Sequence, residues 1–325
     1  MKKVILLAAV IFSFSLNVFG QGFGRGVPLP VCPGGNQIHI NIIPNIGFNP
    51  KNITFKYAYT IASFPDSKQN VWSFTLEYLT SLISFKSTFN KNAGGPVVWD
   101  NHLVFIHPRP ADPSDLSLPE NIIGWYSAYS SEDISPGNSL SGFFVTTTAL
   151  PGIVRSWTQG DHPLPSVPES AAQATCGPPD PYSSDDNVIL KTVGPDILPK
   201  NLTPVQLLTR LISLKEQAFQ LGWITNAGVA NSLDAKLNEA KKKLQEGETQ
   251  VTINLLKSFI LDLEAQHQKE EPENEEGQKH EQEKEEEQSH KHVTDNAYYL
   301  LKPNAEFILY KLKEQEEQNQ KEDEK

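Results

Sequence analysis

The amino-acid sequence predicts a β-sandwich of about seven antiparallel strands followed by a small all-α helical bundle. Three observations lead to this expectation. From about residue 36 to residue 160, apolar residues alternate with polar ones with a period of two. No amphipathic helix separates these runs, so neighbouring strands are expected to pair antiparallel. From residue 201 onwards, apolar residues instead recur every three or four positions, which is typical of helices that pack through one face.

Seven runs within residues 36–160 have the alternation of strands with one buried and one solvated face. They begin near Ile38, Ile53, Trp72, Val97, Ile122, Leu140 and Ile153. Clusters rich in Pro, Gly, Asn and Asp separate the runs, and these residue types favour turns. Trp72 shares the apolar side of its run with Phe74 and Leu76, so we interpret it as a core residue. This number and spacing of strands favour two packed sheets.

The first 20 residues have the features of a signal peptide. Lys2 and Lys3 precede an apolar run over residues 4–14, and cleavage after Gly20 leaves Gln21 as the new N-terminus. The alternative is a retained membrane anchor, but the apolar run is shorter than the roughly 20 residues that a spanning helix needs. We therefore expect a secreted bacterial protein, extracellular or periplasmic, with no membrane insertion of the mature form.

Two segments poor in large apolar residues flank the predicted sandwich. Residues 21–35 are rich in Gly and Pro and are expected to form an extended lead-in. Residues 161–200 contain repeated prolines, among them Pro165, Pro179 and Pro195. Proline keeps a chain extended and stops it joining a sheet. The sequence therefore predicts a linker over residues 161–200.

Three helices are expected in residues 201–268. Thr203 and Pro204 form a helix start, because Thr caps exposed N–H groups and Pro suits the first turn. Gly222 and Gly247 are expected to end the first two helices. The residues predicted to face inward from the third, at about 248–267, are Val251, Leu255, Phe259 and Leu263. Short connections between these helices imply antiparallel neighbours in a small bundle.

Residues 269–292 form an acidic low-complexity insert. They contain ten acidic residues, four lysines and three histidines, and no large apolar side chain. Such a segment buries too little surface to offset chain entropy, so we expect it to be disordered or to form a single solvated helix. The last helix of the bundle is predicted over residues 293–313, kinked or divided at Pro303, with a charged, frayed tail at 314–325.

Four short runs in the helical part follow a recurring pattern. They are Leu221–Ile224, Asn231–Ala240, Leu244–Gly247 and Leu255–Ile260. On these residues, and on the apolar stripe of the last helix, residues 203–312 resemble the FIMAH domain, a helical module at or near the C-terminus of many secreted bacterial and archaeal proteins. The acidic insert and Pro303 depart from that pattern. The resemblance implies an extracellular accessory role and brings no catalytic residues.

A further run lies in the predicted sandwich. Residues Pro136–Phe143 read Pro-Gly-Asn-Ser-Leu-Ser-Gly-Phe, and Leu150-Pro151-Gly152 follows them. On these residues the sandwich resembles an all-β module of bacterial secreted proteins. This resemblance implies only that the sandwich is an extracellular β domain.

The net charge and the absence of known motifs argue against several classes of partner and of catalytic chemistry. The chain has 28 basic and 39 acidic residues, a net charge of −11, whereas nucleic acids and anionic membranes require a basic footprint. The sequence contains no Gly-rich phosphate loop, His-Glu-x-x-His motif or nucleophile elbow. His102 and His107 lie five residues apart on one predicted strand and therefore point to opposite faces. We expect no nucleic-acid partner, catalytic residue, metal or cofactor.

Cys32 and Cys176 bracket the predicted sandwich. An exported chain enters an oxidising compartment, so the two cysteines can pair there. Closing so long a loop stabilises the fold by about 4–5 kcal/mol in the entropic model. The alternatives are two unpaired thiols or pairing with another chain, but an even number of cysteines at flanking positions favours the intramolecular disulfide.

Aromatic residues supply the remaining candidate for a binding site. Exposed Trp and Tyr rings bind sugars, and Trp125, Tyr126 and Tyr129 lie in one run as a possible ligand platform. The alternative is that they belong to the core, where most aromatic side chains lie. The sequence favours a secreted non-catalytic protein with a recognition or structural sandwich and a helical accessory or association module, whose partner is an extracellular protein or polysaccharide. A carbohydrate-binding module using these rings and an enzyme of unrecognised type are the alternatives.

Overall fold

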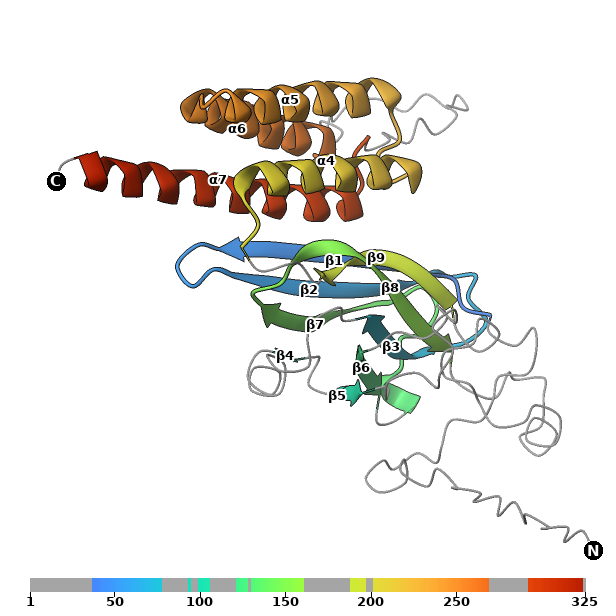
Figure 1. The fold of residues 1–325 in the computed structure, drawn as a ribbon. Helices are drawn as coiled ribbons and strands as arrows, with labels where there is room; N and C mark the ends of the chain where they lie inside the picture. The colour runs from blue at the N-terminus through green and yellow to red at the C-terminus, as the bar shows by residue number, and fades with distance from the viewer. Residues whose placement is uncertain are drawn as a thin grey trace, which may run out of the picture.

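The structure is a computed structural model that describes most of the predicted sandwich and helices. The described residues are 37–77, 93–94, 99–105, 121–127, 130–160, 188–196, 201–268 and 292–323. Within them, two β-sheets pack face to face and helices form further layers beside the sheets (Figure 1). A sandwich followed by a helical bundle is the fold class that the sequence predicts, so that prediction is confirmed.

Both sheets are antiparallel throughout their described strands. The first has the order β1-β2-β7-β4, with bounds β1 Ile40–Asn49, β2 Thr54–Ser63, β4 Ala93–Gly94 and β7 Ser139–Thr147. The second has the order β5-β6-β3-β8-β9, with bounds β3 Val71–Glu77, β5 Trp99–Phe105, β6 Asn121–Ser127, β8 Leu150–Gly160 and β9 Val188–Asp196. Each of the seven runs expected from the sequence overlaps one of these strands, and β4 and β9 are described in addition to them.

Strand β2 illustrates how alternation builds the core between the sheets. Its buried residues include Phe55, Tyr57, Tyr59 and Ile61. Tyr59 meets Phe74 of the opposite sheet edge-on, with 5.5 Å between ring centroids. The Tyr59 hydroxyl also donates a hydrogen bond to the carbonyl of Val193 in β9 at 2.9 Å. Burying one such aromatic side chain stabilises the fold by about 1.5–3 kcal/mol, so this face supplies much of the contact between the sheets.

The linker predicted over residues 161–200 is wrong at its C-terminal end, because Val188–Asp196 forms strand β9. This strand pairs with β8 and is the outermost described strand of its sheet. Pro195 lies in it opposite Pro151, and an edge strand tolerates proline because its outer N–H groups need no strand partner. Thr192 and Val193 are fully buried, so β9 contributes to the core.

The helices of the described residues are α4 Pro204–Gln220, α5 Ala227–Gln245, α6 Thr249–His267 and α7 Asp295–Asp323. Local signals fix the first of them as predicted. The Thr203 hydroxyl accepts a hydrogen bond from the Gln206 N–H at 3.3 Å, and the Gln206 side chain accepts one from the Thr203 N–H at 2.8 Å. Gly222 and Gly247 follow α4 and α5 with φ values of 71° and 82°, which glycine adopts without strain.

The predicted inward face of α6 is partly wrong. Val251 is 40% exposed and Leu255 is only half-buried. The residues that α6 buries are Thr252, Ile253, Leu256, Phe259 and Leu263. Because α6 carries apolar residues on several sides, its periodicity alone does not identify one buried face.

Helix α7 is longer than the last helix that the sequence predicts. It continues through Pro303 without division and ends at Asp323, inside the predicted charged tail. The next residue, Asn304, is 4% exposed and donates hydrogen bonds to the carbonyls of Leu300 at 2.7 Å and Pro151 at 3.0 Å. Packing and hydrogen bonding on both sides of Pro303 therefore offset the roughly 3 kcal/mol that proline costs inside a helix.

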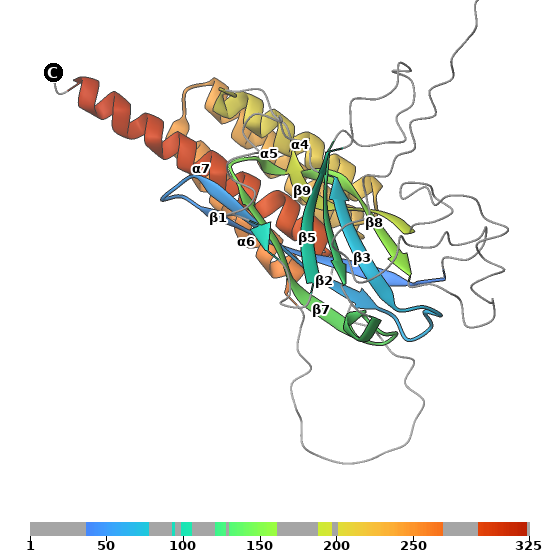
Figure 2. The ribbon, with the colours of Figure 1, turned by 90° about the horizontal axis from the view of Figure 1, so that it is seen from below.

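The helices cover an edge of the sandwich rather than one of its faces. Strands β1 and β9 are the edge strands on the same side of the two sheets, and α7 contacts both (Figure 1). Helix α4 lies beside α7, while α5 and α6 form a layer farther from the sheets. Seen from below, the C-terminal part of α7 extends past the sandwich (Figure 2). This arrangement protects two edge strands whose free N–H and C=O groups would otherwise attract other chains.

Aromatic rings hold α7 on the hairpin of β1 and β2. Phe307 lies edge-on to Phe48, with 5.7 Å between ring centroids, and 5.9 Å from Phe55. Tyr310, one turn further along α7, meets Phe48 at 5.9 Å. The other apolar residues that α7 buries include Ala297, Leu300, Leu301, Ile308 and Leu312. One helix thus belongs to the core of the sandwich edge and to the core of the bundle.

The described residue Val293, just before α7, lies close to the end of α6 and to the turn between α4 and α5. A β-bridge joins Ile224, between α4 and α5, to Val293, just before α7. The Val293 N–H also donates to the carbonyl of Gln266 near the end of α6, at 3.4 Å. The described residues on the two sides of segment 269–291 are therefore held beside each other.

Candidate functional site

The prediction of an exposed aromatic platform is wrong for Trp125. Trp125 is fully buried between the sheets. Its ring stacks on Phe74 with 5.3 Å between centroids and an interplanar angle of 9°, and it meets Phe143 edge-on at 5.9 Å. Alternation along β6 places Trp125 on the core side, so it has no free ring face for a sugar.

Tyr126 points to the other side of β6 and is half-buried. Its ring lies 5.6 Å from Trp72, which is also half-buried rather than part of the fully buried core. The ring covers Gly124, where an added Cβ would approach the Tyr126 hydroxyl to 2.5 Å. Burial raises the pKa of Tyr126 above the ordinary tyrosine value, although a hydrogen bond with Thr75 acts in the opposite direction. Tyr126 thus packs on the outer side of its own sheet.

A charged pair joins β3 and β8. Arg155 donates to the Glu77 carboxylate from its backbone N–H and from Nη2, both at 2.9 Å. The Glu77 side chain is 10% exposed, so this pair is largely removed from water. The Arg155 guanidinium also lies 5.3 Å from the centroid of the Trp157 ring, within reach of a cation–π interaction. These contacts strengthen the pairing of two central strands.

The junction between the sandwich and the helices contains a second polar cluster, which sequence reasoning missed. Arg210 of α4 donates to Asn304 of α7, to the carbonyl of Pro151 in β8 and to Asp196 at the end of β9, each at 2.8 Å. The Arg210 side chain is 14% exposed. One guanidinium therefore links four elements. The available signal was an Arg among the leucines of α4, together with an Asn directly after a helical proline.

A third cluster joins α6 to the first turns of α7. His267 lies 2.7 Å from Asp295, measured from Nε2 to Oδ1, and its ring stacks on Tyr298 with 4.0 Å between centroids. Lys302 donates to Glu264 at 2.8 Å and to the Tyr298 hydroxyl at 2.9 Å. Asp295 lies in the first turn of α7, where a negative charge suits the dipole of that helix.

Burial and charge shift the pKa values in this cluster in definite directions. Burial alone lowers the pKa of Lys302, but its hydrogen bonds to Glu264 and Tyr298 outweigh burial and raise that pKa above the ordinary lysine range. Burial raises the pKa of Tyr299. Burial also raises the pKa of Glu306, against the attraction of Lys302 at 3.9 Å. These shifts keep Lys302 charged and the Tyr299 phenol neutral at ordinary pH.

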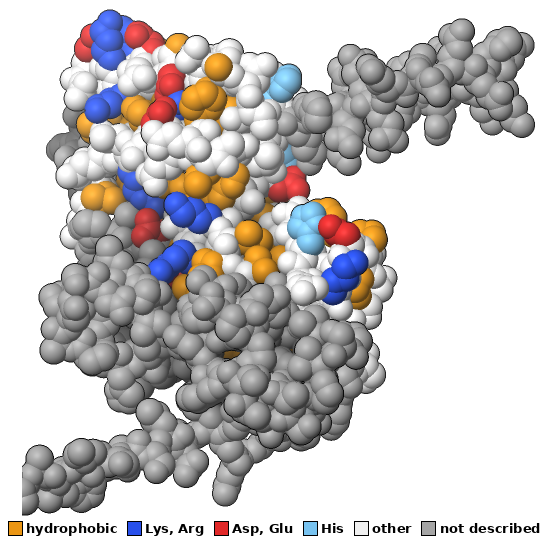
Figure 3. All heavy atoms as spheres, turned by 90° about the vertical axis from the view of Figure 1, so that its right-hand side faces the viewer, with side chains coloured by type: hydrophobic (Ala, Val, Ile, Leu, Met, Phe, Trp, Pro, Cys, Tyr) orange, Lys and Arg blue, Asp and Glu red, His pale blue; other side chains and the backbone are white. Residues whose placement is uncertain are grey.

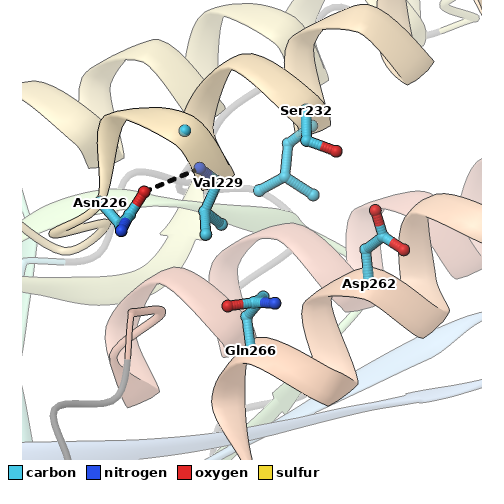
Figure 4. Close-up of a pocket in the computed structure, with 7 residues that line it drawn as sticks. Asn226, Val229, Ser232, Asp262 and Gln266 are labelled. Carbon is cyan, nitrogen blue, oxygen red and sulfur yellow. Dashed lines mark hydrogen bonds between the residues drawn. The ribbon is translucent and has the colours of Figure 1, made fainter.

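A pocket of about 290 Å³ opens between the first turns of α5 and the last turns of α6 (Figure 4). Its lining residues are Asn226, Gly228, Val229, Ser232, Leu233, Asp262 and Gln266. Asn226 caps α5 by accepting a hydrogen bond from the Val229 N–H at 3.1 Å, and Asp262 pairs with Lys236. Asp262 and Gln266 extend from α6 toward α5 in Figure 4. The lining combines the apolar side chains of Val229 and Leu233 with polar groups, and its one acid, Asp262, is paired with Lys236, so the pocket suits the side chain of a partner better than acid–base chemistry.

Other predicted residues lie outside the described part of the chain. They are Gly20, Gln21, Cys32, Tyr129 and Cys176. Signal cleavage and the disulfide therefore stay predictions. Among the described residues, no group of three or more His, Cys, Asp or Glu side chains is arranged to hold a metal ion.

The molecular surface carries both signs of charge. On the face shown in Figure 3, acidic and basic side chains are interspersed, and hydrophobic side chains form small separate groups. Within the described residues, every helix is too short or too polar to cross a membrane.

Comparisons with known proteins provide no family and a weak similarity to a solved structure. No protein-family model matches the chain, and no curated protein matches it. Among solved structures, the chain is similar to an uncharacterized protein from Nocardia farcinica described as having an immunoglobulin-like fold. The two share 12% identity, the match covers 46% of this chain and 95% of that chain, and the TM-score is 0.24. The description of the sandwich therefore depends on the strands of this chain itself.

Proposed function

We propose that this chain is a secreted, non-catalytic protein with a recognition or structural sandwich and a helical accessory or association module. The observation that carries the proposal is the junction around Arg210, which joins α4, α7, β8 and β9. Because α7 packs on the sandwich edge and on the bundle, the outer helices are presented in a constant orientation. A fixed orientation suits an association module better than a loosely tethered domain would.

The charged clusters support the same proposal. The pairs Arg155–Glu77, Lys302–Glu264 and His267–Asp295 each connect two different elements. Their polar groups are engaged in holding layers together, which is a structural use of charge. The runs that resemble the FIMAH domain also include residues of the α4–α5 turn and three of the four buried residues of α5, and the resemblance adds an extracellular accessory role. A carbohydrate platform centred on Trp125 forms no part of the proposal, because that ring is buried.

Export is tested by expressing the full chain and a variant lacking residues 1–20 in a bacterial host, followed by fractionation. We expect the full chain in the periplasm or medium with Gln21 at its N-terminus, and the variant in the cytoplasm. A cytoplasmic full-length product that retains residues 1–20 would contradict a secreted protein.

Recognition without catalysis is tested by incubating the mature protein with a polysaccharide array and with immobilised envelope proteins. Bound ligand is then analysed by mass spectrometry. We expect a retained ligand of unchanged mass. Release of a smaller or modified product would identify an enzyme and reject the proposal.

A further inference from the structure

The sheet β5-β6-β3-β8-β9 has an outer face, which is turned away from the other sheet. Phe74 of β3 packs on Tyr59 of the other sheet, so the next residue, Thr75, points outward. Thr75 is in register with Trp157 of β8, and Trp157 is in register with Ile189 of β9. These three side chains therefore form one row across the outer face.

Exposure falls steeply along this row from the edge of the sheet to its centre. Ile189 is 40% exposed, whereas Trp157 is 2% and Thr75 is 6% exposed. Ser73, the next outward-facing residue of β3, is 3% exposed. A side chain on an uncovered sheet face keeps one side in contact with water. The outer face of β3 and β8 is therefore covered, while that of β9 is open.

The described helix that contacts β8 and β9, α7, approaches them from a different side. The Thr192 side chain of β9 is buried, and its hydroxyl lies 3.2 Å from Oδ1 of Asn296 in α7. Thr192 is an odd number of positions from Ile189, so these two side chains point to opposite faces of the sheet. The cover over Trp157 is therefore supplied by residues outside the described ranges.

We propose that the outer face around Trp157 is a docking surface whose occupant is the chain's own segment 161–187. This segment begins directly after Gly160, three residues beyond Trp157, and ends before Val188, which is in register with Thr158. Both of its ends thus lie at the same end of the outer face. Its 27 residues reach much farther than the roughly 10 Å across two strands, so the segment can cross β8 and β3 and return.

The composition of this segment suits the surface. It has six prolines, five acidic residues and no Lys or Arg. Proline-rich chains form extended helices that dock on aromatic rings, and the outer face offers Trp157 and the adjoining pair Trp72 and Tyr126. Lys191, exposed and in register with Arg155, places a positive charge at the open rim of the face. Opposite charges on the two surfaces favour their contact.

The pattern of burial favours this segment over the other proline-rich stretch, residues 106–120. That stretch joins β5 to β6 at the end of the face where Glu77 lies. The Arg155 side chain beside Glu77 is 30% exposed, whereas Trp157 and Ser73, nearer to Gly160, are almost fully buried. Burial thus deepens toward the end of the face where segment 161–187 begins and ends.

Photo-crosslinking in the full chain tests the proposal. The photoreactive residue p-benzoylphenylalanine replaces Ile189, which borders Trp157, and in a matched control replaces Ile53, which is 37% exposed after the β1–β2 turn. Irradiation, proteolysis and mass spectrometry then locate the linked residues. We expect the probe at position 189 to link to residues between Pro163 and Pro181, and the probe at position 53 to give no such links. Links from position 189 to residues 106–120 or 21–36 instead, or equal links from position 53, would overturn the proposal.

Charge reversal at the rim provides a second measurement. In the chain that carries the probe at position 189, Lys191→Glu should lower the yield of these links by about threefold, because it repels the acidic segment. Lys51→Glu is the matched control, since Lys51 is also exposed but lies at the β1–β2 turn, and it should leave the yield unchanged. Circular dichroism should show that both variants fold like wild type. Equal yields with Lys191→Glu and Lys51→Glu would contradict the docking of an acidic segment at this rim, whereas the proposed function depends only on its own tests of export and ligand retention.

Discussion

Arg210 shows how a single residue can connect parts of the chain that look independent in the sequence. It occupies one side of an otherwise leucine-rich helix, where its charge suggests a solvated position. The structure instead gives it partners from β8, β9 and α7. Local pattern could not predict this role, because its partners Asp196 and Asn304 lie 14 and 94 residues away along the chain. Trp125 is the opposite case, because its grouping with Tyr126 and Tyr129 suggested an exposed platform, whereas its ring is fully buried.

Replacing Arg210 with Met should destabilise the fold by about 2–4 kcal/mol, because it leaves Asp196 and the carbonyl of Pro151 without this donor in a largely buried place. Urea unfolding followed by tryptophan fluorescence measures the change. Lys243→Met is the control, since Lys243 pairs with Glu246 at an exposed helix end, and its midpoint should stay close to wild type. If the two substitutions lower the free energy of unfolding equally, the junction contributes no more to stability than an exposed ion pair does.

Glu306 should make stability depend on pH. Burial raises its pKa in the folded state above the unfolded value of about 4.3, so the folded protein increasingly loses stability as pH rises from that value through the folded pKa. Glu306→Gln should therefore raise the melting temperature at pH 7 and have little effect near pH 4.

Glu246 supplies a control of opposite sign. A hydrogen bond from Lys243 lowers the pKa of Glu246, so its stabilising effect is present above the unfolded pKa and is lost as pH falls. Glu246→Gln should lower the melting temperature slightly at pH 7. Melting curves of both variants at pH 4 and pH 7 test whether the two changes in melting temperature have opposite signs. A higher melting temperature of Glu246→Gln at pH 7 would contradict this prediction.

The predicted disulfide between Cys32 and Cys176 is open to direct test. Gln37 donates its backbone N–H to Gln69 at 2.7 Å, and Gly160 lies beside the same Gln69 side chain, so the described chain near each cysteine converges on one corner of the sandwich. Peptide mapping of the exported protein without reduction should yield a Cys32–Cys176 linked peptide. Two alkylated thiols in native protein would reject the bond.

At the scale of elements, helix starts and stops were the most predictable features. These features depend on residues within one turn of the helix end, so a short stretch of sequence is enough to predict them. The residues concerned are Thr203, Gln206, Gly222 and Gly247. Strand β9 was missed because its pairing with β8 depends on a distant segment and on an edge position that admits Pro195. The pocket between α5 and α6 was missed for a similar reason, since two helices define it jointly.

Replacing residues 269–291 with a four-residue Gly-Ser linker should leave the melting temperature and helix content almost unchanged. The bridge between Ile224 and Val293 and the hydrogen bond from Val293 to Gln266 already hold the flanking residues together. A four-residue linker can span roughly 13 Å, which exceeds what these contacts require. Thermal melts and circular dichroism test this expectation.

A stop after Gln268 is the contrasting variant, because it removes α7 as well. It should expose the rings of Phe48 and Phe55 and destabilise the remaining chain by several kcal/mol, at about 25 cal/mol per Å² of apolar surface. If this truncated chain melts like wild type, α7 is not part of the core.

At the scale of the whole molecule, the sandwich and the bundle share one continuous apolar core. The sequence suggested two domains and a linker, whereas α7 packs against α4, α6, β1 and β8. Two independent domains would unfold separately, but parts that share a core and a buried polar junction should unfold together.

Calorimetry of the mature chain should therefore show one transition whose van't Hoff and calorimetric enthalpies agree. Arg210→Met weakens only the junction. We expect it to lower the transition temperature or to divide the single transition into two. Two resolved transitions in wild type would mean that the interface is too weak to couple the two parts.

The position of α7 over β1 also has a consequence for the order in which the protein is made. The ribosome produces β1 well before α7, so the strand lacks its cover until the residues between Asn49 and Asp295 have been synthesised. At 5–20 residues per second this interval lasts about 10 to 50 s. During that time the first edge strand is open to pairing with other nascent chains. Synthesis of α7 is thus the event that covers this strand, and any pause before residue 295 prolongs the exposure.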